Sequence, residues 1–498
     1  MKALSGLTLL TTAFLASADE PSTTTEEKTD PKVEAVAEAV ERFTDQPETQ
    51  AGSVGFSVRF LDVPTEGQPG TIAKPAYEAL GNKSLLPAST LKLVTTGCAL
   101  EILGKDYQFS TVLKHDGSLD AETGLLAGNV HIVGNGDPTL AEDGWSILFG
   151  KWLEALQEAG IKNVNGHVVG DGTAFHTQAV SGAWTWDDIG NYYAPNVTGL
   201  NFYRNTFRIS FQPGSVGSIA MFIGTNPKVP ELKFVNEMYT GSASSGDQGY
   251  VYGAPYATTY YLRGSIPRQE EAFSIKGALP DPAYFCAHQF DAYLKTKGIP
   301  VEGAATTVRR GDFKKSGTPI ELSTHLSRPL NELIRPVNHK SLNLDAEALL
   351  KAIGNKRSNK GTTADGAKAV LSYLVEQGLA TTGFDMIDGC GLARGNGISP
   401  NQLTAILALF ANRNNGLRES LPIAGRSGTL KSIGGGTSAE GRIRGKSGTV
   451  HRTKCYAGYV DCQSGRTAAF AIMVNQYTGS YAPVKSGITS VMARLAEM

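Results

Sequence analysis

The stretch LPASTLKLVTTGCALEILG, residues 86–104, contains Ser89-Thr90-Leu91-Lys92, a serine and a lysine separated by two residues. Apolar residues follow at near-helical spacing up to Gly104, which predicts a helix whose first turn carries both side chains. Positions three apart share a helix face, so the ammonium group of Lys92 can reach the hydroxyl of Ser89. A partly desolvated lysine can take the hydroxyl proton and make the serine a nucleophile. An ordinary solvated helix is the alternative for this motif alone.

Two further motifs follow in the chain. Ser341-Leu342-Asn343 lies just ahead of a helix-like run, where an ordinary helix cap is the alternative. Lys446-Ser447-Gly448-Thr449 ends a short alternating segment and precedes the strand-like stretches CYAGYVDC and TAAFAIMVN. Lys315 and Lys485 also begin a Lys-Ser-Gly triplet, but one lies in a Gly- and Lys-rich turn and the other starts a terminal helix. Only the setting of Lys446 predicts an edge strand beside a cleft.

The three motifs occur in the same order in a known family. Class A β-lactamases and penicillin-binding proteins use Ser-x-x-Lys, Ser-x-Asn and Lys-Thr/Ser-Gly in this order. With further stretches, the chain resembles the penicillin-binding protein 4 type (DacB-like) D-Ala-D-Ala carboxypeptidases/endopeptidases over residues 33–498. These stretches are GNGDPTL (134–140), WTWDDIGNYYAP (184–195), DGCGLARGNGISP (388–400), LPIAGRSGTL (421–430) and GKSGTVHRTKCYAGYV (445–460). The chain departs from the family pattern at Leu342, Cys390, Ala393 and Ser447.

The resemblance implies a catalytic role for five residues. Ser89 would attack the carbonyl carbon of a terminal D-Ala-D-Ala, and Lys92 would take the hydroxyl proton. Ser341 would pass a proton to the leaving amine, while Lys446 maintains positive potential near this relay and the substrate carboxylate. Asn343 has an amide that can bind both the substrate carbonyl and Lys92.

The resemblance also implies a substrate-binding set. The hydroxyls of Ser447 and Thr449, on either side of Gly448, would bind the substrate carboxylate. The backbone N–H groups of Thr449 and the nucleophile would form the oxyanion hole. Arg394 and Asp188 would line a pocket for the side chain of the stem peptide, where opposite charges suit a zwitterionic end such as that of meso-diaminopimelate. A structural ion pair or cap is the alternative for these two residues.

Composition excludes several classes of protein. The 498 residues allow about three domains. With 46 basic and 47 acidic residues and no basic stripe, we expect no nucleic-acid partner. The five cysteines match no zinc pattern, so we expect no metal and no cofactor.

The N-terminus resembles a secretory signal. Lys2, an apolar run from Leu4 to Leu15 and the small residues at 16–18 predict a signal peptide over residues 1–18. A disordered or amphipathic start is the alternative. Residues 19–32 form a polar linker, and no later apolar run is long enough for a transmembrane segment in the mature chain. We therefore expect an exported, periplasmic protein.

The predicted fold class is α+β and multidomain. A helix near 33–43 and a strand at 54–60 combine with C-terminal strands and a final helix. Residues 33–103 and 326–498 are expected to form a discontinuous DD-peptidase/β-lactamase-like domain, an antiparallel sheet flanked by helices plus a helical part. Short strand patterns such as NVHIVG and FRISFQ fill residues 104–325, an insertion expected to form two β-rich domains.

The sequence therefore predicts a periplasmic serine-type D-Ala-D-Ala carboxypeptidase that also acts as a DD-endopeptidase on peptidoglycan stem peptides. β-Lactam antibiotics, which resemble acyl-D-Ala-D-Ala, should acylate the same serine and act as inhibitors. A β-lactamase-like hydrolase of the same fold and a catalytically weak wall-binding protein are the alternatives. The oligomeric state stays open.

Overall fold

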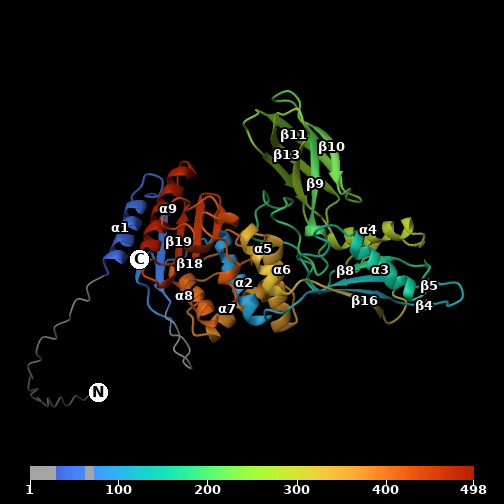
Figure 1. Ribbon diagram of the computed structural model, residues 1–498. Helices are drawn as coiled ribbons and strands as arrows, with labels where there is room; N and C mark the ends of the chain where they lie inside the picture. The colour runs from blue at the N-terminus through green and yellow to red at the C-terminus, as the bar shows by residue number, and fades with distance from the viewer. Residues whose placement is uncertain (1–29, 62–71) are drawn as a thin grey trace, which may run out of the picture.

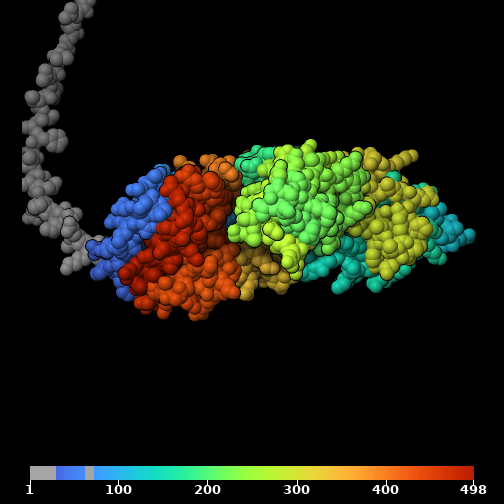
Figure 2. Space-filling model, turned by 90° about the horizontal axis from the view of Figure 1, so that it is seen from above, coloured from blue at the N-terminus to red at the C-terminus, as the bar shows by residue number. Residues whose placement is uncertain are grey.

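The computed structural model describes residues 30–61 and 72–498. The predicted signal peptide and most of the predicted linker lie outside these residues. The fold is α+β and the molecule is elongated. A sheet built from both ends of the chain lies at one end, and the sheets of residues 104–325 extend from it (Figures 1 and 2).

The two ends of the chain meet in a five-stranded antiparallel sheet of order β17-β18-β19-β1-β2. Successive strand residues point to opposite faces, so β18 places Tyr456 on one face and Cys455 and Ala457 on the other. The first face packs on the amphipathic helices α1 and α9, which lie side by side in Figure 1. The elements are β1 (Ser53–Phe60), β2 (Tyr77–Ala79), β17 (Ile443–Val450), β18 (Thr453–Asp461), β19 (Thr467–Asn475), α1 (Pro31–Thr44) and α9 (Tyr481–Glu497).

A group of helices covers the other face of this sheet. The central helix α2 is buried on nearly all sides, because helices surround it and the sheet closes the remaining side. Gly97 of α2 is needed for this packing, since an added Cβ would lie 2.2 Å from the ring of Phe410 in α8. The elements are η1 (Ala88–Leu91), α2 (Lys92–Ile102), α5 (Leu330–Lys340), α6 (Asn343–Ser358), α7 (Thr363–Glu376), α8 (Pro400–Arg413) and η3 (Arg418–Ser420). The short η4 (Gly428–Leu430) instead adds Leu430 to the core on the α1–α9 face.

The insertion contains a second five-stranded sheet, of order β15-β8-β6-β3-β16, at the far end of the molecule (Figure 1). Phe149 and Trp152 of α3 and Phe290 of α4 form an aromatic core beside this sheet. The elements are β3 (Ser110–His115), β6 (Val130–Gly134), β8 (Val168–Asp171), β15 (Thr306–Thr307), β16 (Ile320–Leu326), α3 (Ser146–Glu158) and α4 (Pro282–Thr296). A small sheet adjoins it, formed by β4 (Ser118–Leu119), β5 (Leu125–Ala127) and β7 (Asn163–Val164).

A further β-rich unit projects from the body of the molecule, in green in Figure 1. It contains two three-stranded sheets, of order β10-β9-β14 and β11-β13-β12. The elements are η2 (Tyr203–Asn205), β9 (Thr206–Gln212), β10 (Met221–Asn226), β11 (Lys233–Gly241), β12 (Gln248–Tyr252), β13 (Thr259–Pro267) and β14 (Phe273–Ala278). The domain boundaries at 103 and 325 stay predictions, and β16 ends one residue beyond the second.

Polar contacts fasten the insertion to α6. The guanidinium of Arg204 binds both carboxylate oxygens of Asp345, at 2.7 and 2.8 Å, and also pairs with Glu142. Lys351, one turn and a half further along α6, donates to the carbonyl oxygens of Gln178 and Val197 at 2.9 Å each. The helix that begins at the Ser-x-Asn motif is therefore also the support of the insertion.

One local prediction compares directly with the structure. The predicted helix near 33–43 is present as α1, although it begins earlier, at Pro31, with the side chain of Asp30 as its N-cap. All five cysteines are buried and free. Among the described residues, none of the helices combines the length and apolarity that a membrane span requires.

Candidate active site

The Ser-x-x-Lys motif lies where the chain enters α2. Lys92 is fully buried, and its ammonium nitrogen donates to Ser89 Oγ at 3.0 Å. The same nitrogen donates to Asn343 Oδ1 and to the carbonyl oxygen of Cys390, both at 2.6 Å. Ser89 lies in the 3-10 turn η1, which runs directly into α2 at Lys92, so the first turn of the predicted helix is 3-10 rather than α. The serine and lysine still share a face.

Burial has the largest influence on the pKa of Lys92. Burial lowers the pKa of Lys92, and the carboxylates of Asp388 and Glu347 partly oppose this change. Burial also lowers the pKa of Lys446 well below its usual value, and the charge of Lys92 acts in the same direction. A neutral Lys92 within hydrogen-bond distance of Ser89 can accept the hydroxyl proton.

The Ser-x-Asn motif forms the link between α5 and α6. Ser341 ends α5 with a left-handed backbone (φ 57°), and its Oγ accepts a hydrogen bond from Lys446 Nζ at 2.9 Å. Asn343 begins α6, and its Nδ2 donates to the carbonyl oxygen of Tyr193 at 2.6 Å. This contact uses one of the two N–H groups of the amide, so the other can still bind the substrate carbonyl. The amide oxygen binds Lys92 as predicted.

Two glycines let the edge strand β17 and the loop of residues 388–400 approach the turn that carries Ser89. Gly448 lies in the edge strand β17, and an added Cβ there would lie 2.7 Å from the carbonyl oxygen of Pro87 and 2.9 Å from the nitrogen of Ser89. A Cβ on Gly391, which has φ +81°, would lie 1.9 Å from the carbonyl oxygen of Ala88. Both positions need glycine because backbone atoms cannot move away as a flexible side chain can.

A cleft of about 520 Å³ opens at Ser89, between the Ser-x-Asn loop and the end of β17. Thr449 lines it, is exposed, and accepts a hydrogen bond from Lys454 Nζ at 3.0 Å. Ser447 is half-buried on the same strand. Lys454 was not predicted from the sequence. It sits directly opposite Thr449 in the β17–β18 hairpin, so an alignment of the two strands would have indicated it.

Asp188 and Arg394 both line this cleft, from segments far apart in the sequence. Asp188 accepts a hydrogen bond from Thr185 Oγ1 at 2.7 Å, and Arg394 is exposed. Within residues 30–61 and 72–498 no ion pair joins them, which disfavours the alternative of a structural ion pair.

Sequence reasoning missed the groups that hold the third partner of Lys92. Glu347 Oε1 accepts hydrogen bonds from the N–H groups of Gly389 and Cys390, at 2.7 and 2.8 Å. Asp388 accepts from the N–H of Gly391 and from Trp184 Nε1, each at 2.8 Å. Together they fix the loop whose Cys390 carbonyl faces Lys92. The available signal was Asn343, Glu347 and Lys351 at spacings of four on one helix, which places all three on one face.

The carboxylates of Glu347 and Asp388 and the thiol of Cys390 lie within 4.8 Å of one another. Glu347 Oε1 and both carboxylate oxygens of Asp388 accept hydrogen bonds from backbone N–H groups, and burial raises the pKa of the thiol well above its usual value. The cluster therefore stabilises the loop.

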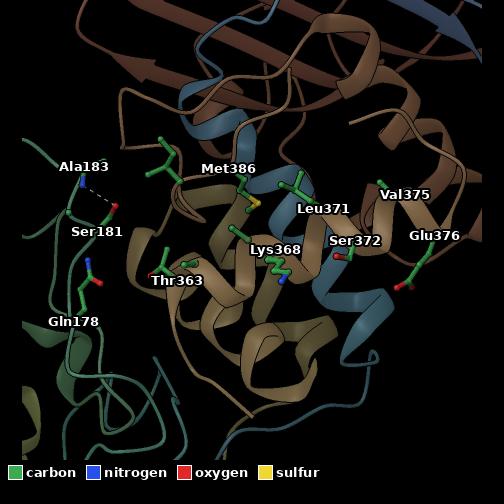
Figure 3. Close-up of a pocket in the computed structure, with 14 residues that line it drawn as sticks. Gln178, Ser181, Ala183, Thr363, Lys368, Leu371, Ser372, Val375, Glu376 and Met386 are labelled. Carbon is green, nitrogen blue, oxygen red and sulfur yellow. Dashed lines mark hydrogen bonds between the residues drawn. The ribbon is translucent and has the colours of Figure 1, made fainter. Parts of the chain in front are cut away.

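A larger cavity, of about 850 Å³, lies away from these motifs. Figure 3 shows Gln178 and Ser181 on one side of it and Lys368 and Leu371 of α7 on the other. None of the predicted catalytic residues lines this cavity. The smaller cleft is the one with a nucleophile and a base in contact, so we place the chemistry there.

The fold and the site define a class of protein. A half-buried serine that contacts a buried lysine, beside a second Ser–Lys pair on a sheet edge, is the arrangement of a serine acyl-transfer enzyme. The chain belongs to the D-Ala-D-Ala carboxypeptidase 3 (S13) family, which matches residues 37–497. It is a serine-type D-Ala-D-Ala carboxypeptidase.

Known proteins resemble it along most of their length. The D-alanyl-D-alanine carboxypeptidase of Actinomadura sp. (strain R39) is 30% identical over 443 residues, which are 84% of this chain and 78% of that protein. D-alanyl-D-alanine carboxypeptidase DacB of Haemophilus influenzae is 26% identical over 412 residues, 80% of this chain and 82% of that protein. The crystal structure of H. influenzae penicillin binding protein 4 superposes with a TM-score of 0.79 at 23% identity, over 94% of this chain and 99% of that one. The likeness to that structure confirms the predicted fold class.

Proposed function

We propose that this carboxypeptidase works through an acyl-enzyme on Ser89, with Lys92 as the general base. The observation that carries the proposal is the 3.0 Å contact between Lys92 Nζ and Ser89 Oγ, together with the burial that lowers the pKa of Lys92. The carboxypeptidase activity of the family requires a nucleophile, a base and a proton donor to the leaving amine, and this cleft supplies all three.

The steps follow from the contacts. Ser89 Oγ attacks the carbonyl carbon of the penultimate D-Ala while Lys92 takes its proton, and backbone N–H groups stabilise the oxyanion. Collapse of this intermediate breaks the C–N bond, and the proton that Lys92 took passes through the Ser341 hydroxyl, supported by Lys446, to the departing amine, so that Lys92 and Ser341 are both neutral again. A water molecule then attacks the ester carbon and gives a proton to Lys92. Collapse of this second intermediate breaks the ester bond, Lys92 returns the proton to Ser89 Oγ, and the acid is released.

Four further properties belong to the proposal. The enzyme also cleaves the D-centred amide of peptide crosslinks, as a DD-endopeptidase. β-Lactams acylate Ser89 and leave slowly, and an H. influenzae relative has been crystallised in complex with a β-lactam. The signal-like residues 1–18 support export to the periplasm, where peptidoglycan stem peptides are the substrate. Asp188 binds the ammonium group, and Arg394 binds the carboxylate group, of the zwitterionic end of the stem side chain.

Labelling with a fluorescent penicillin tests the nucleophile. We expect wild-type protein to carry one covalent label and Ser89→Ala to carry none, while circular dichroism shows an unchanged fold. The control is Ser372→Ala, which removes an exposed hydroxyl of α7 outside the cleft and should keep the label. Undiminished labelling of Ser89→Ala would remove Ser89 from the mechanism. Rapid, repeated turnover of nitrocefin would favour the β-lactamase alternative instead.

A further inference from the structure

A second groove adjoins the catalytic cleft. It has a volume of about 440 Å³ and lies between the Ser-x-Asn loop and strands β9 and β14 of the projecting unit. Tyr193, Ser341 and Asn343 line both the groove and the cleft that contains Ser89. A molecule bound over Ser341 can therefore extend into either space.

Three cations line this groove without an acidic partner. Arg208, Lys276 and Lys340 are exposed, and within the described parts of the chain none of them forms an ion pair. Lys276 lies 6.0 Å from the ring centroid of Tyr192, which also lines the groove.

Two of these cations lie close enough in the sheet to repel each other. Arg208 on β9 and Lys276 on β14 are directly opposite each other in the antiparallel pair. Like charges at such positions destabilise a sheet. An anion between them would relieve the repulsion, so the pair is better explained by a ligand than by the stability of the sheet.

The acidic residues of the groove are largely neutralised. Glu142 pairs with Arg204 and Arg328, and Asp345 pairs with Arg204. Among the described lining residues, Asp143 is the one carboxylate without a cationic partner. Three unpaired cations against one unpaired carboxylate leave the groove positive, which favours an acidic ligand.

The chemistry at Ser341 indicates which ligand this is. The departing amine must lie at the Ser341 hydroxyl to receive its proton, so the leaving group begins at the entrance of the groove. A released D-alanine is a single residue, whereas a cleaved crosslink releases a whole peptide that carries carboxylates beyond its amine. We propose that this groove binds the acidic leaving-group peptide of a crosslink and thereby sets the preference for crosslinks over terminal D-Ala-D-Ala. The inference rests on the endopeptidase part of the proposed function.

The test compares two substrates that share one acyl part. One is a crosslinked dimer of stem peptides, and the other is the pentapeptide that ends in D-Ala-D-Ala. The variants are the pair Arg208→Gln with Lys276→Gln, and Lys340→Gln alone. The matched control is Lys233→Gln, an exposed lysine on β11 that does not line the groove.

We expect the double variant to lower kcat/KM for the dimer relative to the pentapeptide by roughly 5- to 30-fold, since exposed charge contacts contribute little singly and more together. Lys340→Gln should lower this ratio less, and Lys233→Gln should leave it unchanged. The loss should also diminish at high salt, because exposed charges are screened.

A direct binding measurement separates the two proposals. The probe is the free acceptor stem peptide, titrated against wild-type enzyme and the double variant by calorimetry. If the peptide binds the wild-type enzyme and binds the double variant more weakly, the groove is its binding site. If the dimer is nevertheless not cleaved, only the endopeptidase proposal fails. Two results would refute the proposal that the groove binds the leaving-group peptide. One is cleavage of the dimer with an unchanged ratio of the two kcat/KM values in the double variant, and the other is equal binding of the peptide to both proteins.

Discussion

At the scale of residues, the catalytic lysine depends on groups that make no contact with substrate. Lys92 has three acceptors, and one of them, the carbonyl of Cys390, is held by the backbone hydrogen bonds that Glu347 accepts. The charge of Glu347 also raises the pKa of Lys92 against the larger effect of burial. We therefore interpret Glu347 as a positioning residue that also tunes the base.

Glu347→Gln separates these two roles. The amide keeps an oxygen that accepts backbone N–H groups but removes the negative charge, so the pKa of Lys92 should fall further. Since the base works when it is deprotonated, the rise of the penicillin acylation rate with pH should move to lower pH. The measurement is the acylation rate constant from neutral to alkaline pH, with Glu376→Gln, an exposed carboxylate of α7, as the control. If the acylation rate of the Glu347→Gln variant rises at the same pH as in the wild-type enzyme, or at a higher pH, then Glu347 does not raise the pKa of Lys92.

At the scale of elements, the substrate cleft is formed where loops from distant segments face each other. Asp188 follows the Trp-x-Trp stretch of the insertion, and Arg394 ends the glycine-rich loop before α8. Tyr193 lines the same cleft, and its carbonyl oxygen accepts a hydrogen bond from the amide of Asn343. The insertion thus contributes to the cleft directly and also holds the catalytic amide in place.

Arg394→Ala and Asp188→Ala test the charged ends of the cleft. Each should lower kcat/KM for a stem-mimicking peptide with a free diaminopimelate end by about 10- to 150-fold, because one charge-assisted contact contributes about 1.5–3 kcal/mol. Acylation by a plain penicillin, which lacks that end, should fall far less. Equal losses in both measurements would instead assign these residues to the support of the catalytic centre.

At the scale of the whole molecule, the insertion is anchored on α6 by a largely buried charge pair. Asp345 is 2% exposed and Arg204 is 23% exposed at the side chain. Burial raises the pKa of the Asp345 carboxyl, and the guanidinium of Arg204 opposes that rise. Asp345 lies two residues beyond Asn343 in the sequence, so its pair with Arg204 connects the position of the insertion to the Ser-x-Asn loop.

Asp345→Asn should lower the free energy of unfolding on the order of 3 kcal/mol, because it leaves a partly buried guanidinium without one of its charge partners. Denaturant titration measures this loss. Glu376→Gln breaks the exposed pair with Arg357 and should cost less than about 1 kcal/mol. Equal midpoints for the two variants would show that the Arg204–Asp345 pair does not stabilise the molecule.

The sequence by itself determined the class of chemistry and the fold class. Motif order placed Ser89, Lys92, Ser341 and Lys446 in one site, and the structure brings all four together. Periodicity predicted elements such as α1 and β1 because their spacing is a local property of the chain.

Only the tertiary structure decided the remaining contacts. The carbonyl of Cys390 that faces Lys92 lies 298 residues away from it in the chain, and the carbonyl of Tyr193 that binds Asn343 lies 150 residues away. Backbone carbonyls carry no side-chain signature, so no motif could indicate these partners. The cationic groove likewise exists because β9 and β14 place Arg208 beside Lys276, and strand pairing across 68 residues is decided by packing rather than by local spacing.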